Sequence, residues 1–357
     1  MTEYSIVEHV EQITDELRRS DFIGLDTEFM RERTFFAELC LVQVATAGGL
    51  YCVDPLGDSD MRLFWAVATQ TGWVVHSARQ DIEVAYQAAQ CMPRRLFDTQ
   101  IAAGLAGHAP QLGYANLVSA LFGVELSKSH TRADWSRRPL AAEVLQYAVE
   151  DVEYLLPARE RLAEHLDKLG RLAWADEDSA MLLNPALYDT DPQQAILRLK
   201  GARNLRGRRR AAAAALAAWR ESEALRANRP RQWIVKDSVL LEIATRLPRV
   251  VDELNTVADL PGGLLRRSGE QLIELVAASR GEDNDYRPPA VPEEAQKALL
   301  RELQQLVTEC AADLGIAAEI VASKKELSAV ITEGNRESRV FGGWRYGVIG
   351  ERLQQLL

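Results

Sequence analysis

Residues 22–29 read FIGLDTEF, and the rest of the chain is organised around this stretch. Apolar or small residues lead into Asp26 and Glu28, whose i, i+2 spacing places both side chains on one face of a β-strand. Two carboxylates about 4 Å apart repel each other by roughly 4 kcal/mol at an effective dielectric constant of about 20. Because the stretch contains no Lys or Arg, a proton, a distant base or a metal ion has to balance an inward-facing pair. Taken alone, a DxE pair instead favours a strand that ends in a solvated loop.

Composition limits the class of protein. A chain of 357 residues is long enough for two or three domains. The net charge of −10 argues against a protein that coats nucleic acid, so contacts with a polyanion would come from local basic patches. No apolar run reaches the roughly 18 residues of a membrane span, and we expect a cytoplasmic protein with no membrane partner. The scattered cysteines indicate reduced, buried thiols: Cys40, Cys52, Cys91 and Cys310.

Strand and helix patterns alternate through the first half of the chain, which predicts an α/β domain with a mixed sheet flanked by helices. Buried strands are expected at residues 5–7, 22–29, 39–45, 50–53 and 73–75. Helices are expected around residues 10–17 and at 58–69, 96–105, 112–121 and 139–156.

The segment HSARQD, residues 76–81, follows the strand expected at 73–75. Ser77 and Gln80 predict a capping box at the start of a helix, with Asp81 in its first turns. An Asp in that position also stabilises a helix simply by complementing its dipole. The position favours a functional role, because binding sites of open α/β sheets form at the edge where strands end and helices begin.

The segment LSKSHTRADWSRRP, residues 126–139, mixes basic and aromatic side chains. Lys128 and Arg132 are candidates for phosphate contacts, although a solvated loop held by Trp135 fits the same pattern. In the helix that follows, Tyr147 and Asp151 lie four residues apart and therefore share one side.

Four carboxylates from three elements can thus converge at one edge of the sheet, with a tyrosine one turn before the last. Oxygen-only ligands suit Mg²⁺ or Mn²⁺ rather than zinc. A two-metal phosphoryl-transfer site, with ions about 3.5–4 Å apart, requires such a cluster. The candidate residues are Asp26, Glu28, Asp81, Tyr147 and Asp151.

These motifs resemble those of the DEDD superfamily of 3′–5′ exonucleases, which implies a ribonuclease H-like catalytic fold. Asp26-Thr27-Glu28 is similar to the first motif, HSARQD to the second, and YAVED, residues 147–151, to the third in its tyrosine form. Two further segments narrow the resemblance to the ribonuclease D family: FDTQIAAGL, which begins at Phe97, and KSHTRADWSRRPL, which begins at Lys128.

The resemblance implies hydrolysis of the 3′-terminal phosphodiester of RNA, with release of nucleoside 5′-monophosphates. It implies one ion held by Asp26, Glu28 and Asp151, a second held by Asp26 with Asp81 through water, and an attacking water oriented by Tyr147. The expected partner is RNA with a free 3′ end, such as tRNA precursors, and the sequence indicates no oligomeric state. A DNA exonuclease of the same superfamily and a non-catalytic nucleic-acid tethering protein are the alternatives.

The second half of the chain reads as helical. Residues 198–210 carry seven basic residues and no acid, which fits either a phosphate-facing patch or a solvated interdomain helix. Ile234, Val235 and Asp237 recur as Ile320, Val321 and Ser323, and Ser323 with Glu326 predicts a capping box. Residues 208–280 resemble the HRDC domain, and residues 293–357, with GWR at 343–345, resemble a divergent second copy. The expected layout is an exonuclease domain at 1–190, a basic linker at 191–207, these two helical domains, and a linker at 281–292.

Overall fold

The structure, a computed structural model, describes residues 3–126, 133–279 and 293–357. The chain forms two compact units. One comprises Met1–Met30, Leu39–Tyr188 and Pro289–Leu357, and the other comprises Arg31–Glu38 and Asp189–Pro288. Within the described residues, no helix combines the length and the apolar character that crossing a bilayer requires. All four cysteines are free thiols, as expected, and Cys91 is the one that is not buried.

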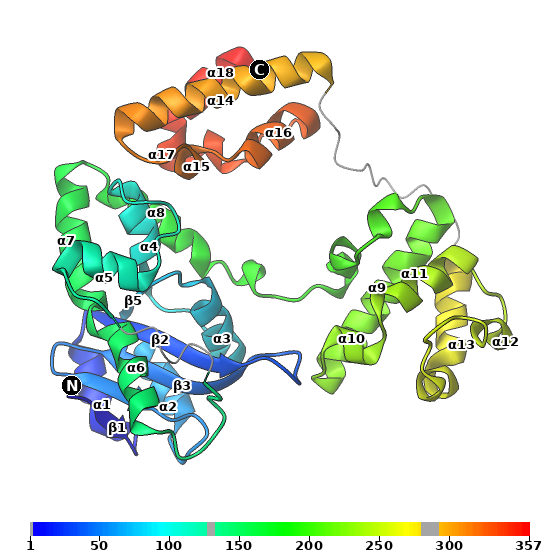
Figure 1. The fold of residues 1–357 in the computed structure, drawn as a ribbon, viewed down its shortest axis with the longest axis horizontal. Helices are drawn as coiled ribbons and strands as arrows, with labels where there is room; N and C mark the ends of the chain where they lie inside the picture. Colours follow the sequence, from blue (N-terminus) through cyan, green and yellow to red (C-terminus); the bar gives the residue numbers. More distant parts are fainter. Residues whose placement is uncertain (1–2, 127–132, 280–292) are drawn as a thin grey trace. The chain divides into compact units, whose positions relative to one another are not determined.

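A six-stranded sheet of order β1-β4-β3-β2-β5-β6 forms the centre of the first unit (Figure 1). The strand pairs β1/β4, β2/β5 and β5/β6 are parallel and β3/β4 is antiparallel, so the predicted mixed sheet is confirmed. The strands are β1 (Ser5–Val7), β2 (Phe22–Met30), β3 (Glu38–Ala45), β4 (Leu50–Val53), β5 (Gly72–Val75) and β6 (Arg95–Asp98).

Helices cover both faces of this sheet. Alternate residues of β5 enter different apolar clusters, since Trp73 and Val75 join one cluster while Val74 joins the other. The first cluster also takes residues of α1 (Glu11–Arg19), α2 (Met61–Ala68) and α3 (Arg79–Ala89). The second takes residues of α4 (Thr99–Leu105), α5 (Tyr114–Phe122), α6 (Ala142–Glu153), α7 (Leu155–Lys168) and α8 (Leu172–Ala180).

Three local predictions were wrong, and tertiary partners explain the first two. The helix expected at 96–105 begins with strand β6, because Leu96 and Phe97 pair with β5, and a short apolar run does not distinguish strand from helix. Ser77 makes no capping box: it adopts φ 61°, and the Asp98 carboxylate accepts the amides of Ser77 and Ala78 at 3.2 and 2.8 Å. The helix expected at 139–156 is interrupted at Tyr154.

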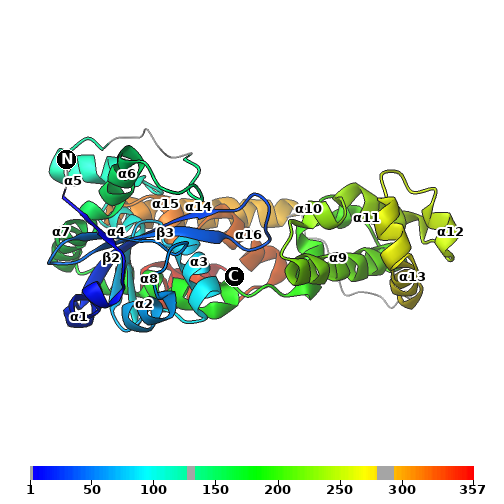
Figure 2. The same cartoon turned by 90° about the horizontal axis from the view of Figure 1, so that it is seen from below.

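The second unit is a helical bundle in which α9 (Gly207–Ala227), α11 (Asp237–Arg246) and α13 (Gly262–Ala278) lie side by side (Figure 2). Short helices α10 (Arg231–Ile234) and α12 (Val251–Leu254) complete it. The basic stretch 198–210 is partly structural. Arg198 pairs with buried Glu221 at 2.8 Å, and buried Arg210 donates to the Ala202 carbonyl at 3.1 Å. The side chains of Lys200, Arg203, Arg206, Arg208 and Arg209 are exposed.

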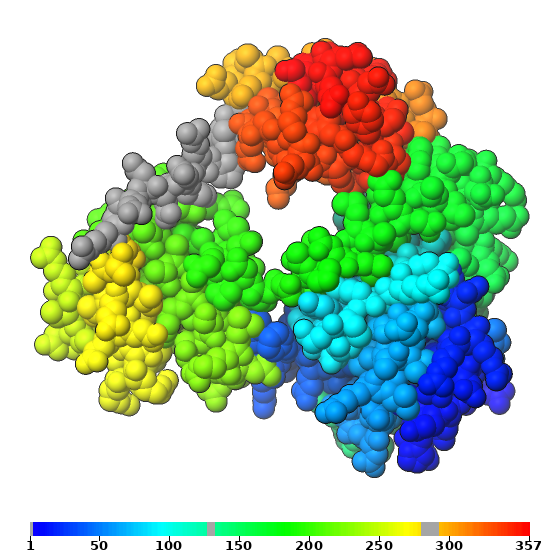
Figure 3. Space-filling model, turned by 180° about the vertical axis from the view of Figure 1, so that it is seen from behind, coloured from blue at the N-terminus to red at the C-terminus, as the bar shows by residue number. Residues whose placement is uncertain are grey.

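The C-terminal helices belong to the first unit. Their apolar residues share a cluster with α4, α7 and α8, and the rings of Trp174 and Trp344 stack with centroids 4.4 Å apart. Figure 3 shows these helices, orange to red, against the green segment that contains α7 and α8. The predicted Ser323–Glu326 capping box is confirmed. The helices are α14 (Glu294–Leu314), α15 (Ala318–Val321), α16 (Lys324–Glu333), α17 (Gly343–Arg345) and α18 (Glu351–Leu356).

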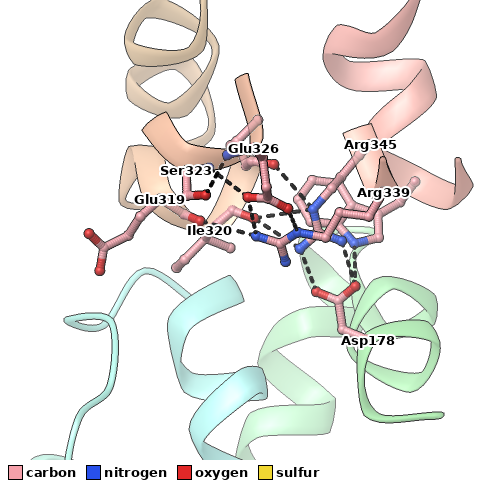
Figure 4. A network of polar contacts seen from close by, with 9 residues as sticks. Asp178, Glu319, Ile320, Ser323, Glu326, Arg339 and Arg345 are labelled. Carbon is pink, nitrogen blue, oxygen red and sulfur yellow. Dashed lines mark hydrogen bonds and ion pairs between the residues drawn. The ribbon is translucent and has the colours of Figure 1, made fainter. Parts of the chain in front are cut away.

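A buried ion pair joins these helices to α8 (Figure 4). Arg345 is 1% exposed, and its two terminal nitrogens donate to the two oxygens of Asp178 at 2.6 and 2.8 Å. The same guanidinium also donates to the carbonyls of Ile320 and Val321. Each of the three guanidinium nitrogens of Arg345 therefore has an acceptor, and such hydrogen bonding is the condition under which a buried pair is tolerated.

A buried arginine contacts each of the two repeated segments, and the two arginines are paired in different ways. In the second unit, buried Arg220 donates to the Val235 carbonyl at 3.1 Å and to Asp237 at 2.6 Å. In the C-terminal copy, Ser323 occupies the position of Asp237 and caps α16. The acid that pairs with Arg345 therefore comes from α8, outside the repeat.

We expect Asp178→Asn to lower the free energy of unfolding by about 3–5 kcal/mol, because it leaves the Arg345 charge buried without a counter-ion. Urea denaturation followed by tryptophan fluorescence measures this, since Trp174 and Trp344 lie at the same contact. Glu164→Gln is the matched control, because it removes a pair with Lys168 in which both side chains are about 70% exposed; such pairs contribute about 0.2–1 kcal/mol. An Asp178→Asn midpoint equal to that of the control would contradict the assigned role.

Candidate active site

Strand β2 and helix α6 bring three carboxylates together. Asp26 and Glu28 lie on β2, and Asp151 lies in the last turn of α6, which packs against β2. One oxygen of each carboxylate lies within 4.8 Å of the other two. Each of these side chains keeps some exposure, so a ligand from solvent can reach the cluster.

Asp81 lies beside this group in the first turn of α3, and its carboxylate is fixed by the backbone of β2. Its Oδ1 accepts from the Thr27 amide at 3.1 Å and from the Thr27 hydroxyl at 2.7 Å. Thr27 points away from Asp26 and Glu28 because side chains alternate along a strand. Residues 26–28 therefore supply two carboxylates and the residue that holds a third.

Burial and mutual repulsion raise the pKa of every member of this set. Desolvation is the main cause, and the neighbouring charges that add to it are all carboxylates. The pKa of Glu28 rises to about 8, and those of Asp81 and Asp151 to about 7. The pKa of Asp26 is raised well above its usual value by desolvation and by Asp81, Asp151 and Glu28.

Tyr147 lies one turn before Asp151 and hydrogen-bonds to its carboxylate. Desolvation and the charges of Asp151, Glu28 and Asp26 raise the pKa of this phenol above its ordinary value of 10.0. The ring lies 6.4 Å from that of Trp135. Tyr147 is therefore a neutral hydroxyl at the rim of the acidic cluster.

Lys128 and Arg132 lie outside the described residues. Later members of their segment have structural roles. Trp135 is buried in an apolar cluster with residues of β3, β4 and α6. Arg138 binds the two oxygens of Asp54 at 2.6 and 2.7 Å, and it also donates to the Cys40 carbonyl.

Sequence reasoning missed three residues that organise the site. Thr27 was quoted only as part of a motif, although it positions Asp81. Asp98 caps α4 and also orders the turn before α3; the signal was available, because an Asp directly after an apolar strand is typical of an N-cap. Tyr114 has no local signal, since its hydroxyl meets the Tyr154 amide, at 3.0 Å, only in the folded chain.

The donor set fits a divalent cation. Three carboxylate oxygens close together, with a fourth carboxylate beside them, match the preference of hard cations for oxygen ligands. A cation would also relieve the repulsion that raises their pKa values. Within the described residues, these three are the one group of acidic, His or Cys side chains that meets the geometric condition for holding an ion.

Comparisons with known proteins identify the family to which this chain is similar. Residues 3–167 match the family model described as 3′–5′ exonuclease, and residues 209–276 match that of the HRDC domain. The ribonuclease D of Acidiphilium cryptum (strain JF-5) is 37% identical over 355 residues, which cover 96% of this chain and 90% of that protein. The ribonuclease D of Granulibacter bethesdensis is 38% identical over 346 residues, which cover 94% and 87%.

The fold agrees as well. The crystal structure of Escherichia coli RNase D, described as an exoribonuclease involved in structured RNA processing, superposes with a TM-score of 0.89 at 27% identity. The match covers 99% of this chain and 98% of the other. The likeness therefore extends through both helical regions as well as the α/β domain. On this evidence the chain belongs to the ribonuclease D family and is a 3′–5′ exoribonuclease.

Proposed function

We propose that this exoribonuclease removes nucleoside 5′-monophosphates from the 3′ end of RNA with two divalent ions, Mg²⁺ or Mn²⁺, held by Asp26, Glu28, Asp81 and Asp151. The observation that carries the proposal is the set of three carboxylate oxygens within 4.8 Å of one another. Bound ions of this kind make water nucleophilic at neutral pH and neutralise charge on the leaving oxygen.

Each side chain has its own role in this proposal. Asp26, Glu28 and Asp151 hold one ion. Asp26 also reaches the second ion, with Asp81 contributing through water. The Thr27 hydrogen bonds hold Oδ1 of Asp81 in place, so this carboxylate would act on the second ion from a fixed position. Tyr147 orients the attacking water by a hydrogen bond, because a phenol with a raised pKa keeps its proton at neutral pH and does not act as a base.

Basic side chains of the helical unit are proposed to bind the RNA backbone. Residues 189–279 contain sixteen Lys and Arg against eleven Asp and Glu, although the whole chain has a net charge of −10. Exposed members of this set can approach phosphates. Lys128 and Arg132, which lie outside the described residues, stay candidates on the basis of the sequence. We further propose that residues 293–357 form a second, divergent HRDC-like module, and that the substrates are cytoplasmic RNAs with a free 3′ end, including tRNA precursors.

The two alternatives are less well supported. A tethering protein has no use for a partly buried acidic cluster, which lowers stability unless cations bind. A DNA exonuclease would share every catalytic residue, but the relatives matched over nearly the full chain are ribonucleases D.

Asp26→Asn and Asp151→Asn should each lower the rate of RNA hydrolysis about a thousandfold, because loss of an ion removes several kcal/mol of transition-state stabilisation. The assay follows a 3′-tailed RNA and a DNA of matched sequence with Mg²⁺. Asp58→Asn, at an exposed position of the same domain, is the control and should keep full activity. Rapid hydrolysis by both active-site variants would exclude the metal assignment, and faster digestion of the DNA would favour the DNA exonuclease.

Tyr147→Phe should reduce kcat about 100-fold and change KM little, because a misplaced nucleophile costs rate rather than substrate binding. Steady-state kinetics on the same RNA separates the two constants. Tyr4→Phe is the control, since Tyr4 lies in the same apolar cluster as Tyr147 and has no proposed role. An unchanged kcat would remove Tyr147 from the mechanism.

The raised carboxylate pKa values predict how stability depends on pH. Glu28 titrates near its ordinary value of about 4.3 in the unfolded chain but at about 8 in the fold. Between these values the folded state holds a proton that the unfolded state has lost, so stability falls as pH rises. The metal-free protein should therefore be less stable at pH 8 than at pH 6.

Glu28→Gln should raise the stability of the metal-free chain at pH 8 by at least about 1.4 kcal/mol, the equivalent of one pKa unit. Urea denaturation in EDTA measures this effect. Added Mg²⁺ should stabilise the wild type more than the variant. Glu302→Gln, at an exposed site on α14, serves as the control. A wild type as stable at pH 8 as at pH 6 would show that burial does not strain these carboxylates.

A further inference from the structure

The junction between α6 and α7 lies close to the acidic cluster. Tyr154 separates the two helices with φ −101° and ψ 3°, three residues after Asp151. In an uninterrupted α-helix, its amide would donate to the carbonyl four residues earlier. Here the Tyr154 amide donates to the hydroxyl of Tyr114 at 3.0 Å and is also shared with the carbonyl of Val152. The end of the helix that carries Asp151 is therefore held by a side chain from α5.

Tyr114 is itself held in place by the ends of β5 and β6. Its ring lies 5.5 Å from that of His76, which directly follows β5. The two ring nitrogens of His76 are hydrogen-bonded to the Thr99 hydroxyl and the Leu112 carbonyl, both at 2.9 Å. Gln100 donates to the same carbonyl at 3.1 Å. The loop that leads into α5 is thus fixed to the sheet edge at which the carboxylates meet.

The carboxylates of the acidic cluster also affect the pKa of the Tyr114 phenol. Burial is the main reason why its pKa lies well above the ordinary value, and the charges of Asp151, Asp26 and Glu153 add to the shift. The group is therefore a neutral phenol near two of the proposed metal ligands. Its place in the site differs from that of Tyr147, which hydrogen-bonds to the Asp151 carboxylate directly.

We propose that Tyr114 is a positioning residue for Asp151: its hydroxyl fixes the Tyr154 amide, and with it the last turn of α6, so that the Asp151 carboxylate is aligned with those of Asp26 and Glu28. The inference rests on the proposed metal-binding function. Groups that orient metal ligands in this way typically contribute about 10- to 100-fold to metal affinity or activity.

Tyr114→Phe tests the proposal, because it keeps the ring beside His76 and removes only the hydroxyl. Titration of the full chain with Mn²⁺, followed by electron paramagnetic resonance, should show metal binding weakened about tenfold. With RNA as substrate, kcat at limiting Mn²⁺ should fall by a similar factor and recover at high Mn²⁺, while KM for RNA stays unchanged. A general loss of structure would not be reversed by added metal.

Tyr154→Phe is the matched control, because it removes the neighbouring hydroxyl and leaves the Tyr154 amide in place. It should bind Mn²⁺ like the wild type. In an Asp151→Asn background, Tyr114→Phe should cause no further weakening, because the ligand on which it acts is already lost.

Three results would overturn the proposal: Mn²⁺ binding by Tyr114→Phe that equals that of the wild type, an equal loss in the Asp151→Asn background, or a lower kcat that high Mn²⁺ does not restore. Failure of the underlying function would look different, since the wild-type chain itself would then neither bind Mn²⁺ nor hydrolyse RNA in a metal-dependent way.

Discussion

The mutual repulsion of carboxylates at one edge of the sheet is the constraint on which the rest of the catalytic domain depends. Asp26, Glu28, Asp81 and Asp151 are brought together from β2, α3 and α6, and the charged groups that shift their pKa values are acids. The surrounding sheet and helices hold these groups in an arrangement that they would not adopt alone. This repulsion lowers the stability of the metal-free domain and favours the binding of cations at the site.

The residues that sequence reasoning located correctly are those whose placement follows from local periodicity. The i, i+2 spacing predicts that Asp26 and Glu28 share a face of β2, and the i, i+4 spacing predicts that Tyr147 and Asp151 share a side of α6. Both relations hold in the structure. The alternation of strands and helices likewise predicted the mixed α/β sheet.

The features that the sequence did not reveal depend on contacts between residues that lie far apart in the chain. Ser77 looks like a helix cap, but the carboxylate of Asp98, at the end of the neighbouring strand, holds the amides of Ser77 and Ala78 instead. Arg138 belongs to the basic and aromatic segment 126–139, but Asp54, 84 positions away, binds it. A basic side chain has the same local signature whether it meets RNA or an internal carboxylate. Tertiary contacts alone distinguish the two.

Two buried arginines of the helical regions, Arg220 and Arg345, differ in where their counter-ions come from. Arg220 finds Asp237 within its own bundle, whereas Arg345 depends on Asp178 of the catalytic domain. A module that balances its charges internally can be transplanted into unrelated proteins as a cassette. A module whose buried arginine pairs with an acid of another domain needs a compensating substitution before it can function in a different protein. Residues 195–278 pair their buried charges among themselves, as the pairs Arg198–Glu221 and Arg220–Asp237 show, whereas residues 293–357 rely on an acid of α8 and have to evolve together with it.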